Sequence, residues 1–262
     1  MNTNLNFKCS LIITSKNGTY NWNLPEGMEV VYATGSRDII RDKNAAVEKS
    51  TGDVLIFLDD DAYFENFEEF MREVVSDYGS RGGQPFSDLI AGRIKDHGNT
   101  HFDKICSQDM GEKFRTVTKS DVSLGVYWMY CSFKAAVLFF TGQLKQAAPP
   151  PWGIGSGTTF VMTRKAFDRV GGFSAECNNV PQGVSLCEDV DLFYRVLYTG
   201  GTVTYNPKMV VIHEHNRTTR EQAEQRRSEY NSGNVYLARR YKTNPVMAIY
   251  SVMFRLLGWQ KK

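Results

Sequence analysis

The sequence predicts an α/β fold in a single compact domain, and three observations lead to this prediction. The chain has 262 residues, of which 42% are apolar and 23% charged, a composition that can build one large globular core. Short apolar runs rich in β-branched residues alternate with longer segments of helical periodicity. One run, Val54 to Leu58, lacks polar alternation, as expected for a strand that is covered on both faces.

The first half of the chain predicts strands separated by amphipathic helices. The strands are segments dominated by apolar residues, at 8–15, 28–34, 53–59 and 88–94. The helices carry apolar side chains at helical spacing, at 37–50 and 64–79. A Thr-Gly pair ends the first helix, and the polar stretch 100–121 predicts no element.

The second half continues the alternation after a loop. Residues 146–157 are rich in proline and glycine, which indicates a loop. The elements expected beyond it are a strand at 158–163, a short helix at 164–170, a helix at 185–201, a strand at 202–215 and a basic, polar helix at 217–241. The apolar face of the helix at 185–201 is Val190, Phe193, Tyr194 and Leu197, and two glycines end it.

Charge and cysteine content narrow the class of protein. The 31 basic and 29 acidic residues leave a net charge of +2, which argues against a nucleic-acid partner, because such proteins are usually clearly basic. The five cysteines are odd in number and form no CxxC pair, so we expect reduced thiols in a cytoplasmic protein. The N-terminal residues do not have the pattern of a signal peptide.

Two segments, 122–140 and 244–262, are apolar enough to need a membrane check. A spanning helix requires roughly 20 largely uncharged residues, and each segment is interrupted by a basic residue. One interpretation is a buried helix and a docked terminal helix. The alternative is peripheral contact with the inner face of the cell membrane, with Trp259, Lys261 and Lys262 at the headgroup level.

Three aspartates, Asp59 to Asp61, directly follow the most apolar predicted strand. Ligands of parallel α/β sheets bind beyond the carboxyl ends of the strands. If the extended geometry continues, Asp59 and Asp61 lie on one side and suit a hard divalent cation, Mg²⁺ or Mn²⁺. The simpler alternative is an exposed acidic turn.

A second acidic cluster, Glu188, Asp189 and Asp191, opens the helix at 185–201. Acidic side chains favour helix N-termini through the macrodipole, and Asp191 stands four residues before Arg195, a common helix pair. This accounts for one or two of the acids more easily than for three. A carboxylate directed into a pocket could act as a general base toward a hydroxyl group.

Two histidines, His213 and His215, end the last predicted strand. Their spacing of two places them on one side of the strand. A single histidine is usually structural, whereas a pair near acidic residues is a candidate for metal ligation.

With these clusters in this order, the chain resembles the family 2 glycosyltransferases of the GT-A fold over most of residues 8–235. The resemblance rests on four blocks: CSLIITSKN, RDKNAAVEKSTGDVLIFLDDDA, GIGSGTTFVMTRKAFDRVGGF and EDVDLFYRVLYTGGTVTYNPKMVVIHEH. It implies a Rossmann-like mixed sheet flanked by helices. The domain would span 1–240, with a nucleotide-sugar-binding half to about residue 100 and an acceptor half beyond it, followed by an amphipathic tail, 241–262.

The resemblance also implies an activity and a set of site residues. The activity would be inverting transfer of a hexose or related sugar from a nucleoside-diphosphate sugar to a hydroxyl of a saccharide or lipid-linked acceptor, in glycan or cell-envelope synthesis. Asp189 would be the base and Glu188 its supporting group, and Mn²⁺ or Mg²⁺ would be bound by Asp59, Asp61 and His213 or His215. The residues expected to contact the donor are Thr14, Ser15, Arg41, Asn44, Asp59, Asp60, Gly157 and Arg217.

Several features leave alternatives open. After the second strand the family commonly has acidic residues, where this chain has Ala33 and Thr34, so the nucleotide is undetermined. Arg217 could clamp the diphosphate or lie on a solvated helix face. Two rival functions are a nucleotidyltransferase-like phosphoryl enzyme, for which TSKNGTY is a poor phosphate loop, and a non-catalytic nucleotide-sugar-binding module, which would not need the intact Glu188–Asp189 pair.

Overall fold

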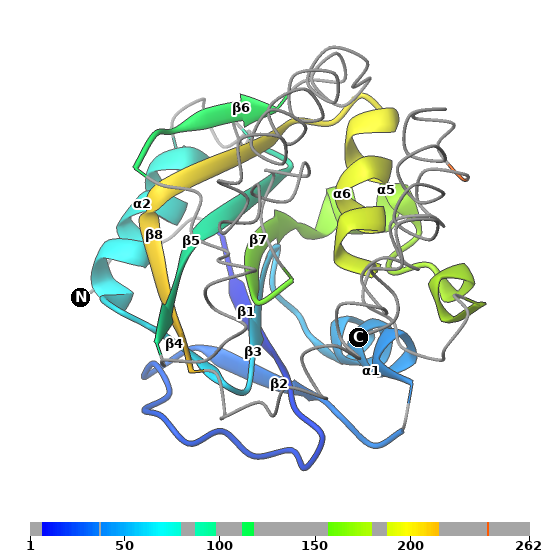
Figure 1. The fold of residues 1–262 in the computed structure, drawn as a ribbon, viewed down its shortest axis with the longest axis horizontal. Helices are drawn as coiled ribbons and strands as arrows, with labels where there is room; N and C mark the ends of the chain where they lie inside the picture. Colours follow the sequence, from blue (N-terminus) through cyan, green and yellow to red (C-terminus); the bar gives the residue numbers. More distant parts are fainter. Residues whose placement is uncertain are drawn as a thin grey trace, which may run out of the picture.

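The fold is a mixed β-sheet with helices on both faces, seen in a computed structural model (Figure 1). The structure describes residues 7–36, 38–79, 87–97, 112–117, 157–179, 188–214 and 240. The strands are β1 (Cys9–Thr14), β2 (Glu29–Ala33), β3 (Val54–Asp59), β4 (Ala62–Phe64), β5 (Leu89–His97), β6 (Arg115–Val117), β7 (Thr159–Thr163) and β8 (Val203–Glu214). The helices are α1 (Ile39–Lys49), α2 (Phe67–Gly79), α5 (Arg164–Val170) and α6 (Glu188–Tyr198), with a short 3₁₀ helix, η1 (Ala175–Asn179).

The strand order is β2-β1-β3-β7-β5-β8-β4, with β6 paired to β8. The first three strands are parallel, β7 runs antiparallel to both of its neighbours, and β5 and β8 are parallel. Because β1 and β3 run in the same direction with Thr14 opposite Asp59, their carboxyl ends reach the same edge of the sheet. The predicted mixed α/β sheet in one compact domain is therefore confirmed.

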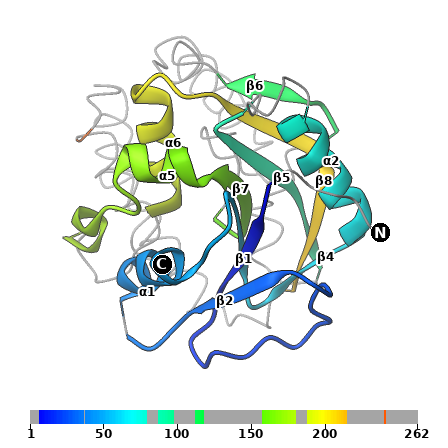
Figure 2. The same ribbon diagram turned by 180° about the vertical axis from the view of Figure 1, so that it is seen from behind.

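Alternate residues of the central strands face two separate cores. In β1, Ile12 packs under α1, α5 and α6, whereas Leu11 and Ile13 pack on the side of α2. Figures 1 and 2 show α2 alone on one side of the sheet and the other three helices together on the opposite side. The period of two in a strand thus gives each face its own apolar layer.

The predicted elements that fall on described residues form near their expected positions, and three further elements, β4, β6 and the 3₁₀ helix η1, were not predicted. The helix expected from residue 64 begins at Phe67, because the Asn66 side chain accepts a hydrogen bond from the Glu69 backbone N–H, 3.1 Å, as helix-capping residues do. The residues before it form β4, paired antiparallel with β8. Strand β6 lies in a stretch whose polar sequence predicted no element.

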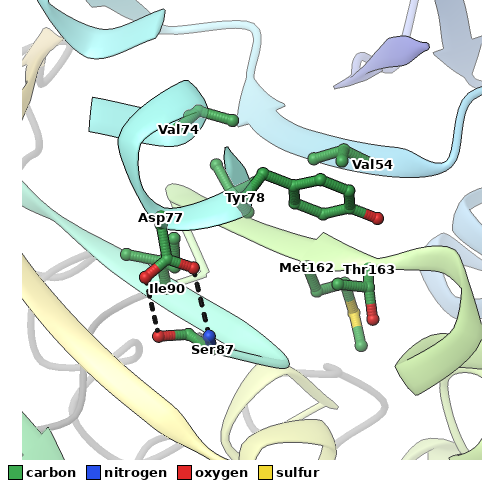
Figure 3. A pocket seen from close by; sticks show the side chains of 9 residues that line it. Val54, Val74, Asp77, Tyr78, Ser87, Ile90, Met162 and Thr163 are labelled. Carbon is green, nitrogen blue, oxygen red and sulfur yellow. Dashed lines mark hydrogen bonds between the residues drawn. The ribbon is translucent and has the colours of Figure 1, made fainter. Parts of the chain in front are cut away.

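A small hollow under α2 lies at the opposite end of β3 from the aspartates. Val54, Tyr78 and Met162 line it, together with Asp77, which Figure 3 shows bonded to Ser87. The Asp77 carboxylate accepts hydrogen bonds from the Ser87 backbone N–H and hydroxyl at 3.1 and 3.2 Å. These contacts tie the end of α2 to the chain that enters β5.

Among the described residues no helix is long and apolar enough to cross a membrane. The apolar segments 122–140 and 244–262, the helix expected at 217–241 apart from residue 240, and the tail lie outside the described residues. Of the five cysteines, Cys9 and Cys177 are described, and both are buried free thiols.

Candidate active site

The aspartates lie where β1, β3 and β7 meet. Asp59 ends β3, and its backbone N–H donates to the Thr158 carbonyl at 3.0 Å. The Asp60 N–H donates to the Thr14 carbonyl, also at 3.0 Å. Asp60 and Asp61 form a turn into β4, so the extended geometry considered for residues 59–61 does not continue.

Asp59 carries a strongly shifted pKa. Burial raises the pKa of its carboxyl group to about 7; the negative charges of Asp61 and Glu188 also raise it, and the positive charges of Lys43 and His213 lower it. The pKa therefore shows that charged groups from four parts of the chain act on the carboxyl end of β3.

Asp61 and His213 form a pair at this edge of the sheet. The His213 Nε2 atom lies 3.2 Å from Asp61 Oδ1, and the side chains are 8% and 39% exposed. The antiparallel pairing of β4 with β8 explains the contact, since it sets Ala62 opposite His213 and lets the Glu214 N–H donate to the Asp61 carbonyl at 2.8 Å. His215, the second histidine of the prediction, lies outside the described residues.

The three acids at the start of α6 have three different environments. Glu188 accepts a hydrogen bond from the Lys43 ammonium at 2.9 Å, and both side chains are buried. Asp191, fully buried, pairs with Arg195 at 2.8 Å and with Arg240 at 3.3 Å. The macrodipole and the pair with Arg195 therefore account for only part of this cluster.

Asp189 instead lies against Gly157, at the entry to β7. A Cβ atom at residue 157 would be 2.7 Å from Asp189 Oδ2, so any larger residue there would force the Asp189 side chain to shift. Gly157 directly precedes Thr158, whose carbonyl binds the Asp59 backbone. The candidate base and the end of β3 are thus joined through two consecutive residues.

The pKa of Asp189 is raised to about 6. Burial is the largest cause, followed by the negative charge of Glu188; the positive charge of Lys43 and the backbone N–H groups of Val190 and Asp189 itself lower it. A carboxyl group with this pKa is ionised at neutral pH and is a stronger base than an ordinary aspartate.

Lys43 is a site residue that the sequence analysis missed. Burial alone would lower the pKa of this lysine, but the carboxylates of Glu188, Asp59 and Asp189 outweigh it and raise the pKa, so the side chain is a buried cation. A signal was present: Lys43 stands three residues after Ile40 and three before Ala46, on the face that the apolar spacing of α1 predicts to be buried.

The other residues expected to contact the donor have different positions and hydrogen-bond partners in the structure. Thr14 pairs with Asp59 across the sheet edge, and Arg41 is exposed on α1. The Ser15 hydroxyl donates to the Thr19 carbonyl at 2.9 Å, and the Asn44 amide exchanges two 2.9 Å hydrogen bonds with the Phe173 backbone. Contact of these residues with a donor stays a prediction, and Arg217 lies outside the described residues.

Asp61 and His213 fit the role of adjacent metal ligands. Two ligand atoms at right angles on an Mg²⁺ ion, each about 2.1 Å from it, would be about 3 Å apart, close to the observed 3.2 Å. The described part of the chain contains no group of three or more histidine, cysteine or acidic side chains arranged to hold a metal ion. Magnesium commonly binds through one or two carboxylates, substrate phosphates and water, so the Asp61 carboxylate suits it, and the His213 imidazole would be the less usual of its ligands.

Comparison with known proteins gives similarity to solved structures alone. No protein-family model matches the chain, and a search of curated proteins found no match. S. aureus TarS 1–349 in complex with UDP has a TM-score of 0.49 and 12% identity, over 88% of this chain and 65% of that one. The same protein with UDP-GlcNAc gives 0.47 and 13%, over 88% and 66%.

GalNAc-T7 with UDP, GalNAc and Mn²⁺ gives a TM-score of 0.46 and 12% identity, over 82% of this chain and 45% of that one. The 65% coverage of TarS 1–349 means that this chain spans less than two thirds of the length of that protein. With TM-scores below 0.5 and identities of 12–13%, these similarities carry no conclusion about the site or the activity.

The buried ion pair leads to a prediction about stability. Lys43→Met should lower the free energy of unfolding by about 3–5 kcal/mol at neutral pH, because it leaves the Glu188 carboxylate buried without its counter-charge. Lys43→Met/Glu188→Leu should recover most of this loss, since an apolar pair can replace a buried ion pair. Urea denaturation measures both.

The matched control is Lys49→Met, an exposed lysine of the same helix, which should change the free energy of unfolding by less than about 0.5 kcal/mol. If Lys43→Met were as mild as this control, the ion pair would not be holding α6 against α1.

Proposed function

We propose that this protein is an inverting, metal-dependent glycosyltransferase that moves a sugar from a nucleoside-diphosphate donor to a hydroxyl group of an acceptor. One observation carries the proposal: a pair suited to metal binding, Asp61 and His213, lies at the same sheet edge as a separate carboxylate of raised pKa, Asp189. Transfer of this kind needs two distinct polar centres, one for the leaving diphosphate and one for the incoming hydroxyl.

At the donor side, Asp61 and His213 would hold Mn²⁺ or Mg²⁺, with Asp59 beside them toward the nucleoside. The bound ion would offset the negative charge that develops on the diphosphate as it leaves. A cation would also relieve the repulsion between Asp59 and Asp61, part of which is visible in the raised pKa of Asp59. Metal binding would explain why three aspartates occur in succession, which the alternative of an exposed acidic turn does not.

At the acceptor side, Asp189 would take the proton of the attacking hydroxyl. The acceptor oxygen forms a bond to the anomeric carbon on the face opposite the diphosphate, and the bond from that carbon to the diphosphate oxygen breaks. The leaving oxygen keeps the bonding electrons, and the proton ends on the Asp189 carboxylate. One displacement of this kind inverts the configuration at the anomeric carbon.

The proposal specifies the donor only as a nucleoside-diphosphate sugar and the acceptor only as a hydroxyl compound. A thermal-shift screen of UDP-, GDP-, dTDP- and CMP-linked sugars, with and without Mn²⁺, tests the donor, because a ligand of the folded state raises apparent stability. The acceptor would be a saccharide, free or lipid-linked. If no nucleotide sugar raises the melting temperature with or without Mn²⁺, the proposed activity is wrong.

Asp61→Ala should weaken Mn²⁺-dependent binding of the nucleoside diphosphate by at least about 10-fold, because it removes a ligand that supports the metal and its partner histidine. Isothermal titration calorimetry with UDP and GDP measures this. The matched control is Glu65→Ala, which removes an exposed carboxylate paired to Lys95, and it should bind as wild type does. Unchanged affinity in Asp61→Ala would exclude Asp61 as a metal ligand.

Asp189→Asn should lower the transfer rate by about 10²–10⁴-fold while donor binding is retained, since general-base catalysis contributes on this order. Steady-state assays with the donor found in the screen give the rate. Asp168→Asn, at an exposed position of α5, is the control and should be neutral. Wild-type turnover by Asp189→Asn would eliminate it as the base.

The raised pKa of Asp189 predicts a pH dependence. The base form is lost as the pH falls through about 6, so kcat/KM should decline below that value. The folded state also binds this proton more tightly than the unfolded chain, whose carboxyl pKa is about 3.9. As the pH rises from about 4 to about 6, the contribution of Asp189 to the free energy of unfolding should therefore decrease. Asp189→Asn should lack this decrease. Identical pH profiles of stability in both proteins would contradict the shift.

A further inference from the structure

Lys43 joins three parts of the molecule at one buried point. Its ammonium donates a hydrogen bond to Glu188 Oε1 at 2.9 Å and lies 5.2 Å from the centre of the Phe173 ring. Asn44, the next residue of α1, binds the Phe173 backbone through its amide. Helix α1 therefore contacts both the first turn of α6 and the turn that follows α5.

The environment of Lys43 is that of an internal group. The side chain is 3% exposed, and its partner Glu188 is 7% exposed. The charge of Lys43 acts on Glu188, on Asp59 and on Asp189, which come from the end of β3 and the start of α6. A fixed cation at this point offsets repulsion among the acids of the site without itself being presented to a ligand.

The position of Asp189 depends on the residue beside it. Glu188 and Asp189 are the first two residues of α6, so anchoring the Glu188 side chain fixes the turn that carries Asp189. The Asp189 side chain occupies the space that a Cβ atom at residue 157 would need, 2.7 Å from its Oδ2 atom, so Gly157 leaves room for it there. Misplacement of a reacting group by about 1 Å can lower a rate by about 10²-fold, so an anchor of this kind has catalytic consequences.

We propose that Lys43 is a positioning residue, whose ammonium anchors Glu188 and thereby holds the Asp189 carboxylate beside Gly157 in the orientation that proton transfer requires. This inference rests on the proposed function and deepens it. It specifies how Glu188 would support Asp189, as an anchored neighbour in the same helical turn, and it connects α1 to the acceptor side of the site.

The charges around Asp189 supply a readout that a purely structural pair would not give. The charged groups that act on it are Glu188 from its own helix and Lys43 from α1, together with the backbone N–H groups of Val190 and Asp189. Glu188→Gln removes the like charge and leaves the cation. The pKa of Asp189 should then fall, on the order of one unit.

Four variants test the proposal in the full-length protein. Lys43→Met/Glu188→Leu removes both charges of the pair, so neither partner is left without the other. Lys43→Arg keeps a cation, Glu188→Gln changes the charge of the acid alone, and Lys49→Met is the exposed control. The measurements are kcat and donor KM, calorimetric binding of UDP and GDP with Mn²⁺, and the titration of Asp189 by carboxyl ¹³C NMR, assigned with Asp189→Asn.

We expect the double variant to bind the Mn²⁺–nucleotide within about 3-fold of wild type and to lose about 10–100-fold in kcat, because the base is displaced but still present. Lys43→Arg should recover at least a tenth of the wild-type kcat. Glu188→Gln should shift the acid limb of kcat/KM and the NMR titration of Asp189 downward together.

Two kinetic or binding results would overturn the proposal. Wild-type kcat in the double variant would mean that the pair supports the fold alone. A loss of nucleotide affinity as large as the loss of kcat would make Lys43 a donor contact. The NMR titration separates this proposal from the proposed activity. If no donor is turned over but the pKa of Asp189 is lower in Glu188→Gln, the contact between the two residues is supported and the proposed activity is wrong. If a donor is turned over but that pKa is unchanged, the activity is supported and the positioning proposal is wrong.

Discussion

Repulsion among carboxylates at the carboxyl end of β3 is the constraint on which the site depends. Burial raises the pKa of Asp59 most, and the negative charges of Asp61 and Glu188 raise it further. The Lys43 ammonium, which is paired with Glu188, offsets part of this negative charge. On the Asp61 side, the His213 Nε2 atom lies 3.2 Å from Asp61 Oδ1, and this is the pair that we propose as metal ligands.

Helix α6 shows how one short acidic sequence can serve several purposes. Successive helical residues point about 100° apart, so Glu188, Asp189 and Asp191 face different neighbours. Asp191 is turned inward to Arg195 and Arg240, and Glu188 to Lys43. Asp189 is left at the edge of the site against Gly157. Two of the acids thus fix the helix that presents the third.

Both faces of the sheet are covered by an apolar core, and several polar groups of the candidate site lie on the helices of one face. Between α2 and the sheet, the helix side chains Phe70 and Val74 join an apolar cluster with strand residues, and Asp77 of the same helix is hydrogen-bonded to Ser87. The opposite face also has an aromatic core, in which Phe57 stacks on Phe160 at 4.5 Å. That second core lies directly beneath α1 and α6, so the helices that carry the polar groups of the site rest on rigid packing.

The sequence by itself determined the α/β class and the order of the described elements other than β4, β6 and η1, and it drew attention to the acids of the candidate site, because these depend on local periodicity and on runs of neighbouring residues. The tertiary structure decided the partners. Lys43 and Glu188 are 145 residues apart, and the Asn44 amide closes on Phe173 across 129 residues. Local pattern can show that a side chain is buried, but only long-range packing shows which opposite charge it meets.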